Sequence, residues 1–264
     1  DMGTQSEPPT HPALLDWMSV NLIESQQWSL KELIKSIVLS STYKQSSKTT
    51  PEKLNIDPNN LFYSRGPKVR LQAEEVRDQA LFVAGILSRK IGGVGVMPPQ
   101  PDGVWQSPYS GEAWIESKGE DRYRRAVYTY LKRTSLYPSF VTFDAGTREF
   151  CLINRITTNT PLQALVTLND PVYLEAAYQL AANYDNIDSK DMAISKMYSK
   201  ATYRDIDRNT LQILGSLYED SINRFNDDTG LTEDFLELGK TTVKHAALTI
   251  VANAIMNLDE FLNH

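Results

Sequence analysis

The sequence predicts a mainly α-helical protein, an irregular multi-helix domain with long Gly/Pro/aromatic loops and a small β element, followed by a C-terminal helical bundle. Three observations lead to this fold class. Apolar residues recur at helical spacing through much of the 264-residue chain. Several of these stretches begin with a capping residue followed by proline. Glycines and prolines crowd residues 92–119, a density that no helix tolerates.

The N-terminal part predicts a helical hairpin. Thr10 is a capping residue and Pro12 suits a first turn, so we expect a helix over residues 12–25. Ser29 and Glu32 have the spacing of a capping box, which predicts that a second helix begins there. Residues 44–69 are polar and rich in turn formers, and they read as a surface connection.

The middle of the chain alternates between helices and loops. A third helix is expected over residues 72–90, stopped by Gly92 and Gly93. In the loop 92–119, the aromatic residues Trp105, Tyr109 and Trp114 indicate order. They form either a stacking platform for sugar rings or a plug that fastens the loop to the helices. Residues 125–134 alternate like a strand, although a short helix is also compatible with them.

Further helices follow with clear starts. Pro161 comes after Thr158, Asn159 and Thr160, and Asp170 precedes Pro171, so we expect helices over 161–168 and 171–184. Three more are predicted over 189–202, 209–225 and 232–258, the last with a strongly apolar face.

Charge is distributed unevenly along the chain. Residues 185–264 hold 8 Lys/Arg and 14 Asp/Glu, a net charge of −6, whereas residues 1–184 hold 19 of each and are neutral. We therefore predict a helical body over 1–184 and an acidic helical subdomain over 185–264. An acidic balance argues against a nucleic-acid partner. The local basic run from Arg122 to Arg133 is either a site for phosphate or sulfate or, as is commoner for such runs, solvated charge.

Most familiar signatures of catalysis are missing. The single Cys151 excludes Cys-x-x-Cys motifs, the three histidines lack metal-ligand spacing, and no glycine-rich phosphate loop is present. We therefore expect no metal site and no cofactor within this chain, while enzymatic activity stays open. No apolar run approaches the roughly 20 residues that span a bilayer, so no membrane insertion by this chain is expected. The chain begins at Asp1, which suggests a mature form or an excised piece.

The densest group of polar residues surrounds an apolar stretch at 150–153. It is either a pocket for an oxygen-rich ligand, since arginines bind carboxylates and sulfates well, or a buried ion-pair and capping network that fixes loops. His11 is a further candidate, as a metal ligand or proton shuttle, although ordering the start of a helix is the commoner role. The polar group comprises Asp144, Arg148, Glu149, Arg155, Asn159 and Gln163.

Several segments in order resemble one family. They are Pro9–Trp17, Thr142–Cys151, Asn159–Leu165 and Asn169–Pro171, supported by the closing Asn257–Phe261. Together they resemble the planctomycete-type, cytochrome c-associated domain of unknown function numbered fifteen-fifty-three. Two positions depart from its pattern, Asn154 in place of a usual Arg and Ala247 in place of a frequent Trp.

The resemblance implies the C-terminal part of a large exported bacterial protein, located in the periplasm or at the cell surface. It implies partners among the other domains or subunits of a larger complex, one of them cytochrome c-like. The leading hypothesis is therefore a non-catalytic interaction or scaffold domain. The alternative is a carbohydrate-active or sulfated-glycan unit that uses the Asp144–Gln163 cluster and the aromatic loop. A third is a redox module acting with a partner haem domain. The haem would belong to the partner, because this chain lacks a haem-attachment motif.

Overall fold

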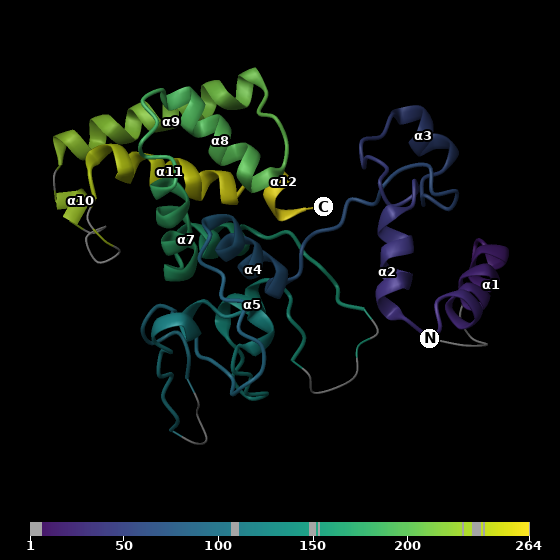
Figure 1. The fold of residues 1–264 in the computed structure, drawn as a ribbon. Helices are drawn as coiled ribbons and strands as arrows, with labels where there is room; N and C mark the ends of the chain where they lie inside the picture. Colours follow the sequence, from purple (N-terminus) through teal and green to yellow (C-terminus); the bar gives the residue numbers. More distant parts are fainter. Residues whose placement is uncertain are drawn as a thin grey trace. The chain divides into compact units, whose positions relative to one another are not determined.

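The computed structural model describes residues 7–106, 111–147, 152, 154–228, 230–233, 239 and 241–263. The chain divides into two compact units, residues 1–69 (unit 1) and residues 70–263 (unit 2). Helices dominate both units (Figure 1) and account for 54% of the structure. Within the described residues no β-sheet forms. The predicted mainly α-helical fold is therefore confirmed.

Unit 1 consists of short helices and turns. They are α1 (Pro12–Val20), a π-helical turn at Asn21–Ser25 that extends it, α2 (Leu30–Leu39) and α3 (Pro51–Ile56). At the start of α2, the Oγ atom of Ser29 accepts a hydrogen bond from the Glu32 amide at 3.4 Å. The predicted starts at Pro12 and Ser29 are thus confirmed, while α3 lies inside the segment 44–69 that was expected to be a surface connection.

Unit 1 lacks a conventional core. In its described part, residues 7–69, only Asp57 and Gly66 are buried, and no apolar side chain is. The large side chains of Trp17 and Trp28 are 57% and 67% exposed. The apolar faces that the sequence places on α1 and α2 therefore remain uncovered within this unit.

Unit 2 holds the longer helices. They are α4 (Ala73–Ala84), α5 (Pro138–Thr142), α6 (Pro161–Asn169), α7 (Pro171–Ala182), α8 (Lys190–Thr202), α9 (Arg208–Asp227), α10 (Gly230–Glu233), α11 (Val243–Met256) and α12 (Asp259–Leu262). Two 3-10 turns, at Gly119–Tyr123 and Ala126–Tyr128, lie in the connection between α4 and α5.

Helix α11 is at the centre of unit 2. It contacts α6, α7, α8 and α9, and Figure 1 shows it running among them. Its sequence is apolar on nearly every side, as expected for a fully buried helix, and Ala247, Leu248 and Ala252 are essentially inaccessible. Alanines on α7, such as Ala176 and Ala177, are equally buried and allow the two helices to approach closely. This small-residue contact forms the middle of the core.

Two predicted helices differ from the structure. The one expected over 72–90 ends earlier, because Gly85 adopts a left-handed conformation (φ 82°) and stops α4. The one expected over 232–258 is divided into α10 and α11, and residues 234–238 and 240 lie outside the described residues. Local apolar spacing predicted both helices but placed their ends too far along the chain.

The predicted strand over 125–134 does not form. Residues 126–128 make a 3-10 turn, and the remaining β character consists of isolated bridges such as Val96 with Thr129. A single bridged pair satisfies few backbone groups, so alternation alone was insufficient without a neighbouring strand. The small β element is therefore limited to bridges in the described part of the chain.

The charge shift and the compact units mark different places in the chain. The charge shift predicts a boundary between residues 184 and 185, and the contacts within the chain divide it between residues 69 and 70. One buried cluster joins Leu71, which precedes α4, and Val76 on α4 to Ile194 on α8 and Ile255 on α11. Apolar contacts decide which helices pack together, and surface charge has little influence on that choice.

Candidate functional site

Gln163 is the centre of a hydrogen-bonded cluster in unit 2. Its side chain is 1% exposed. Its Nε2 donates to the backbone oxygens of Thr142 and Thr158, at 3.1 and 3.2 Å, and its Oε1 accepts two hydrogen bonds from Arg70. All of these partners belong to the protein itself, so the amide of Gln163 joins the loop before α6 to the start of unit 2.

Asp144 completes this cluster. Its carboxylate accepts hydrogen bonds from the amide of Thr158 at 2.7 Å and from the Thr158 hydroxyl at 2.9 and 3.0 Å. Its backbone is left-handed (φ 60°), a conformation that Asp tolerates better than most residues. These hydrogen bonds hold the two loops around Asp144 and Thr158 together. They occupy most of the positions at which the carboxylate could accept a hydrogen bond from a ligand.

Arg155 lies apart from this cluster. Its guanidinium forms a bidentate ion pair with Glu74 on α4, at 2.6 and 2.9 Å, and this pairing raises the pKa of Arg155. Asn159 is exposed, and the capping position of α6 belongs to Thr160. Arg148, Glu149, Tyr109 and Cys151 lie outside the described residues. Among the described members of the predicted constellation, Asp144 and Gln163 therefore share one network and Arg155 belongs to another.

The two described aromatic residues of the predicted loop face inward. The indole N–H groups of Trp105 and Trp114 donate to the backbone oxygens of Ser135 and Pro98, both at 2.8 Å. Their rings lie 5.4 Å apart, and the Trp114 ring stacks on that of Tyr137 at 5.5 Å. Trp105 is 7% exposed. The geometry matches the plug rather than an open stacking platform.

His11 stands at the beginning of α1. Its ring stacks on Tyr63 with centroids 4.5 Å apart, and its Nδ1 lies 3.0 Å from the Thr10 hydroxyl. No group of three or more potential metal ligands occurs among the described residues. The arrangement orders the start of α1 within unit 1.

The sequence did not predict a cluster of buried charged residues in unit 2. Arg77 on α4 is 1% exposed, and its guanidinium donates to the backbone oxygens of Arg124 and Arg122 at 2.7 and 3.0 Å. Arg124 is equally buried and donates to the oxygens of Val94 and Gly92. Solvated charge was thus the wrong interpretation for Arg124. The available signal was Arg77, a charge placed among the apolar positions of its helix.

Asp170 belongs to the same buried region. Its carboxylate caps α7 by accepting from the Val172 amide at 2.9 Å. Burial raises the pKa of Asp170 to about 6, although the Val172 hydrogen bond and the charge of Arg77 act in the opposite direction. Burial likewise lowers the pKa of Arg77. Perturbed groups often mark functional sites, but here the guanidinium is engaged by backbone carbonyls.

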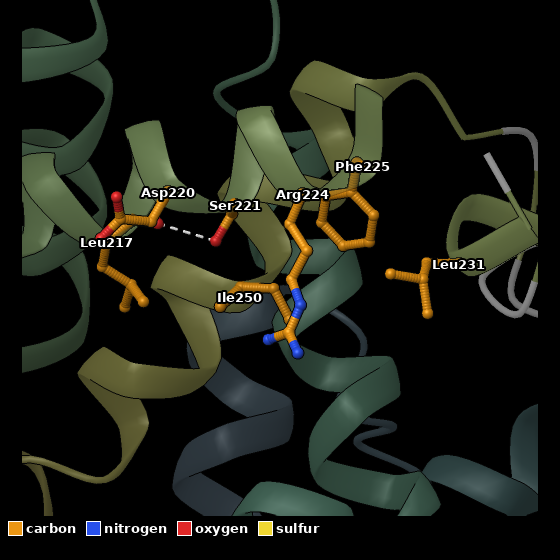
Figure 2. Close-up of a pocket in the computed structure, with 7 residues that line it drawn as sticks. All are labelled: Leu217, Asp220, Ser221, Arg224, Phe225, Leu231 and Ile250. Carbon is orange, nitrogen blue, oxygen red and sulfur yellow. Dashed lines mark hydrogen bonds between the residues drawn. The ribbon is translucent and has the colours of Figure 1, made fainter. Parts of the chain in front are cut away.

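One pocket of unit 2 is shown in Figure 2. It has a volume of about 360 Å³ and lies between α9, α10 and α11, with Leu217, Phe225, Leu231 and Ile250 as apolar walls and Arg224 extending across it. A second pocket, of about 330 Å³, has Glu74, Glu75, Tyr130 and Phe140 among its lining residues.

A pocket larger than these two lies in unit 1. We call it the unit 1 groove, and its volume is about 840 Å³. Leu14, Trp17 and Met18 of α1 and Ile37 of α2 supply an apolar wall, and the segments 42–49 and 58–68 supply the other. Its size falls in the upper part of the range of about 300–1,000 Å³ that is typical of binding sites. Sequence reasoning missed it because its two walls come from a helical hairpin and a loop.

Comparison with known proteins identifies the family. The model of the family described as "Protein of unknown function (DUF1553)" matches residues 1–218, which include all of unit 1 and unit 2 as far as α9. The closing segment Asn257–Phe261 lies beyond this match. No curated protein and no solved structure matches the chain. In the described residues, no helix combines the length and apolar character needed to cross a membrane. The chain belongs to this family.

Proposed function

We propose that this chain is a non-catalytic interaction and scaffold domain of a larger exported bacterial protein, acting in the periplasm or at the cell surface. Unit 1 presents the interaction surface, and unit 2 is the packed body that carries it. Other domains or subunits of a larger complex, including a cytochrome c-like one, are the partners.

The apolar surface of unit 1 is the observation that supports this proposal. None of the residues of α1, α2 and α3 is buried. Contiguous apolar surface of this kind is rare on isolated domains and marks places where another molecule docks. A unit of this size that buries so little apolar surface gains little stability from its own folding. Contact with a partner supplies the missing burial.

The polar residues support a non-catalytic role. Asp144 and Gln163 form hydrogen bonds with the loop around Thr158, and Arg155 is paired with Glu74. A catalytic group needs access to a substrate atom within hydrogen-bond reach. These side chains are instead engaged in holding loops against α4 and α6.

The proposal is tested by weakening the apolar surface without altering the fold. Leu15 and Ile34 are 52% and 58% exposed, so a double variant, Leu15→Glu and Ile34→Glu, should fold normally. We expect the wild-type chain to be isolated from the cell envelope as part of a larger assembly and to show slow hydrogen exchange over residues 12–39. The double variant should be isolated without the assembly and should exchange faster over the same residues. The control is Ser19→Glu with Lys35→Glu, at exposed polar positions on the same helices.

Two results would contradict the proposal. One is full assembly and unchanged exchange in the double variant. The other is tight binding of an acidic or neutral oligosaccharide by the purified chain, lost in Gln163→Leu while the fold is retained. The second result would favour the glycan-processing alternative, because it would place a ligand on the Asp144–Gln163 cluster.

A further inference from the structure

The unit 1 groove has walls of different character. The lining residues from α1 and α2 are mainly apolar, with Ser36 as the polar exception, whereas the remaining lining residues come from a basic segment. Residues 44–68 hold five basic residues, Lys44, Lys48, Lys53, Arg65 and Lys68, and only two acidic ones, Glu52 and Asp57. Arg65 and Lys68 line the groove directly, and no Asp or Glu is among the described residues that line it.

The one buried acidic residue of this segment is turned inward. Asp57 is 5% exposed, and its two carboxylate oxygens accept hydrogen bonds from the amides of Leu61 and Phe62 at 2.7 and 3.0 Å. Its negative charge is therefore used to stabilise the turn at residues 57–62. Lys44 and Lys48, in contrast, are exposed beside the lining residues Tyr43 and Ser47. The outer face of this wall is positively charged.

The basic wall is held in place by backbone contacts. The Gly66 amide donates to the Ser46 oxygen at 3.0 Å, and the Gln45 side chain donates to the Tyr63 oxygen at 2.8 Å. The guanidinium of Arg65 donates to the oxygens of Asp57 and Pro58, both at 2.8 Å. These contacts join segments 45–46 and 63–66, so the positive charges are presented on an ordered surface.

We propose that the unit 1 groove binds an amphipathic helix of a partner protein that carries Asp and Glu along one edge of its apolar face. This inference rests on the proposed function and adds the chemistry of the partner. A helix laid in a groove contacts both walls at once. Its apolar stripe lies on Leu14, Trp17 and Ile37, and its acidic edge faces the segment 44–68. Complementary charge selects the partner and its orientation.

A helix suits this surface better than a membrane. The groove is concave, and basic side chains lie on only one of its sides. A flat lipid surface contacts the rims of a concave site, whereas a cylinder about 10 Å across enters it. Exposed apolar residues outside the groove, such as Leu15 and Ile34, enlarge the contact beyond one small ligand.

The test uses two synthetic peptides and the full 264-residue chain. Isolated helices shorter than about 15 residues are marginal in water, so the peptides have about 20 residues. Both carry the same leucine stripe, and one has Glu where the other has Lys at its edge. Binding is measured by fluorescence anisotropy of the labelled peptide. We expect the Glu peptide to bind at least about tenfold more tightly at low salt, with the difference shrinking as salt screens the charges.

Three variants assign the binding to the two walls. Lys44→Glu with Lys48→Glu should reverse the preference between the peptides. Ile37→Asp should weaken the binding of both by about tenfold, because it places a charge in the apolar wall. Lys35→Glu, on α2 but outside the groove, is the matched control and should change neither. Circular dichroism of each variant confirms that the helices persist.

Other outcomes would overturn the inference. Equal binding of both peptides that is lost in Ile37→Asp would refute the acidic partner while preserving the apolar interaction surface. Tighter binding of the Lys peptide would refute it as well. Binding to vesicles of anionic phospholipid without binding to either peptide would assign the groove to a membrane. Unchanged envelope assembly in the Leu15 and Ile34 double variant would instead count against the proposed function itself.

Discussion

Arg70 and Gln163 lie 93 residues apart in the chain, and both the Nε and the Nη2 of Arg70 donate to the Oε1 of Gln163, at 3.1 and 2.7 Å. The contact joins the beginning of unit 2 to helix α6. Because Gln163 also donates to Thr142 and Thr158, one buried amide connects three segments. Gln163, one member of the predicted polar constellation, thus makes its hydrogen bonds to other parts of the chain.

Gln163→Leu should therefore destabilise unit 2. Leucine has a similar volume but removes the hydrogen bonds that Gln163 makes with the oxygens of Thr142 and Thr158 and with the Arg70 guanidinium. Losing such partners should lower the free energy of unfolding by roughly 2–4 kcal/mol. Urea denaturation followed by circular dichroism measures the change. Asn159→Ala, at an exposed neighbouring position, should change it by less than about 0.5 kcal/mol. A Gln163→Leu variant with the free energy of unfolding of the wild type would show that the hydrogen bonds of Gln163 do not stabilise unit 2.

Arg77→Met should be more costly still. Methionine fills a comparable space but cannot satisfy the backbone oxygens of Arg122 and Arg124, so we expect a loss of roughly 2–6 kcal/mol. The control is Arg125→Met, because the Arg125 side chain is 59% exposed and its ion pair with Asp78 is long, with an N–O distance of 3.5 Å. Surface ion pairs of that kind contribute up to about 1 kcal/mol. Thermal unfolding of both variants is the measurement, and equal losses would contradict this account.

The carboxyl group of Asp170 should make stability depend on pH. Its pKa in the folded protein is raised to about 6 from 3.8. The stabilisation that the protonated Asp170 carboxyl gives the folded protein is therefore fully present below about pH 4 and is lost as the pH rises through about 6. The free energy of unfolding falls by roughly 3 kcal/mol in total over this range. An asparagine at this position would stay neutral and retain an acceptor for the Val172 amide. Asp170→Asn should match the wild type near pH 4 and exceed it near pH 7.

Urea titrations of both proteins between pH 4 and 7 test this expectation. The groups that face Asp170 include Arg77, Tyr137 and Tyr173, since each interacts with it electrostatically. Neither tyrosine changes charge in that interval, because burial raises the pKa of both. A constant stability difference across the interval would refute the assignment of the slope to Asp170.

Gly66→Ala should disturb the basic wall of the unit 1 groove. An added Cβ would lie 2.5 Å from the Gln45 backbone oxygen, closer than real contacts allow, so the segments 45–46 and 63–66 must separate. We expect faster hydrogen exchange of the amide at position 66 and its neighbours. Gly215→Ala is the contrasting control. Its nearest atom would be 4.0 Å away, and alanine should stabilise helix α9 by about 0.5–1 kcal/mol. Equal exchange in wild type and Gly66→Ala would show that the wall tolerates the methyl group.

The sequence by itself determined where most helices begin. Ser29 and Asp170 mark helix starts by accepting hydrogen bonds from amides two or three residues later. Pro12 and Pro161 mark them because the fixed backbone angle of proline suits the first helical turn. Signals of this kind depend only on neighbouring residues and can be recognised in the sequence. The sequence likewise predicted a strongly apolar face on the last long helix, expected over residues 232–258, and the structure places that apolar surface on α11 in the core.

Only the tertiary structure decided how the polar residues are used. Arg77 reaches the Arg124 carbonyl 47 residues away, and Arg70 reaches Gln163 across 93 residues. Residues 125–134 alternate like a strand, but no neighbouring strand pairs with them continuously in the described part of the chain. Hydrogen-bond partners and strand pairing depend on which distant segments meet, and apolar packing sets those meetings. The groove of unit 1 follows the same rule, since its apolar and basic walls become one surface only when the chain folds.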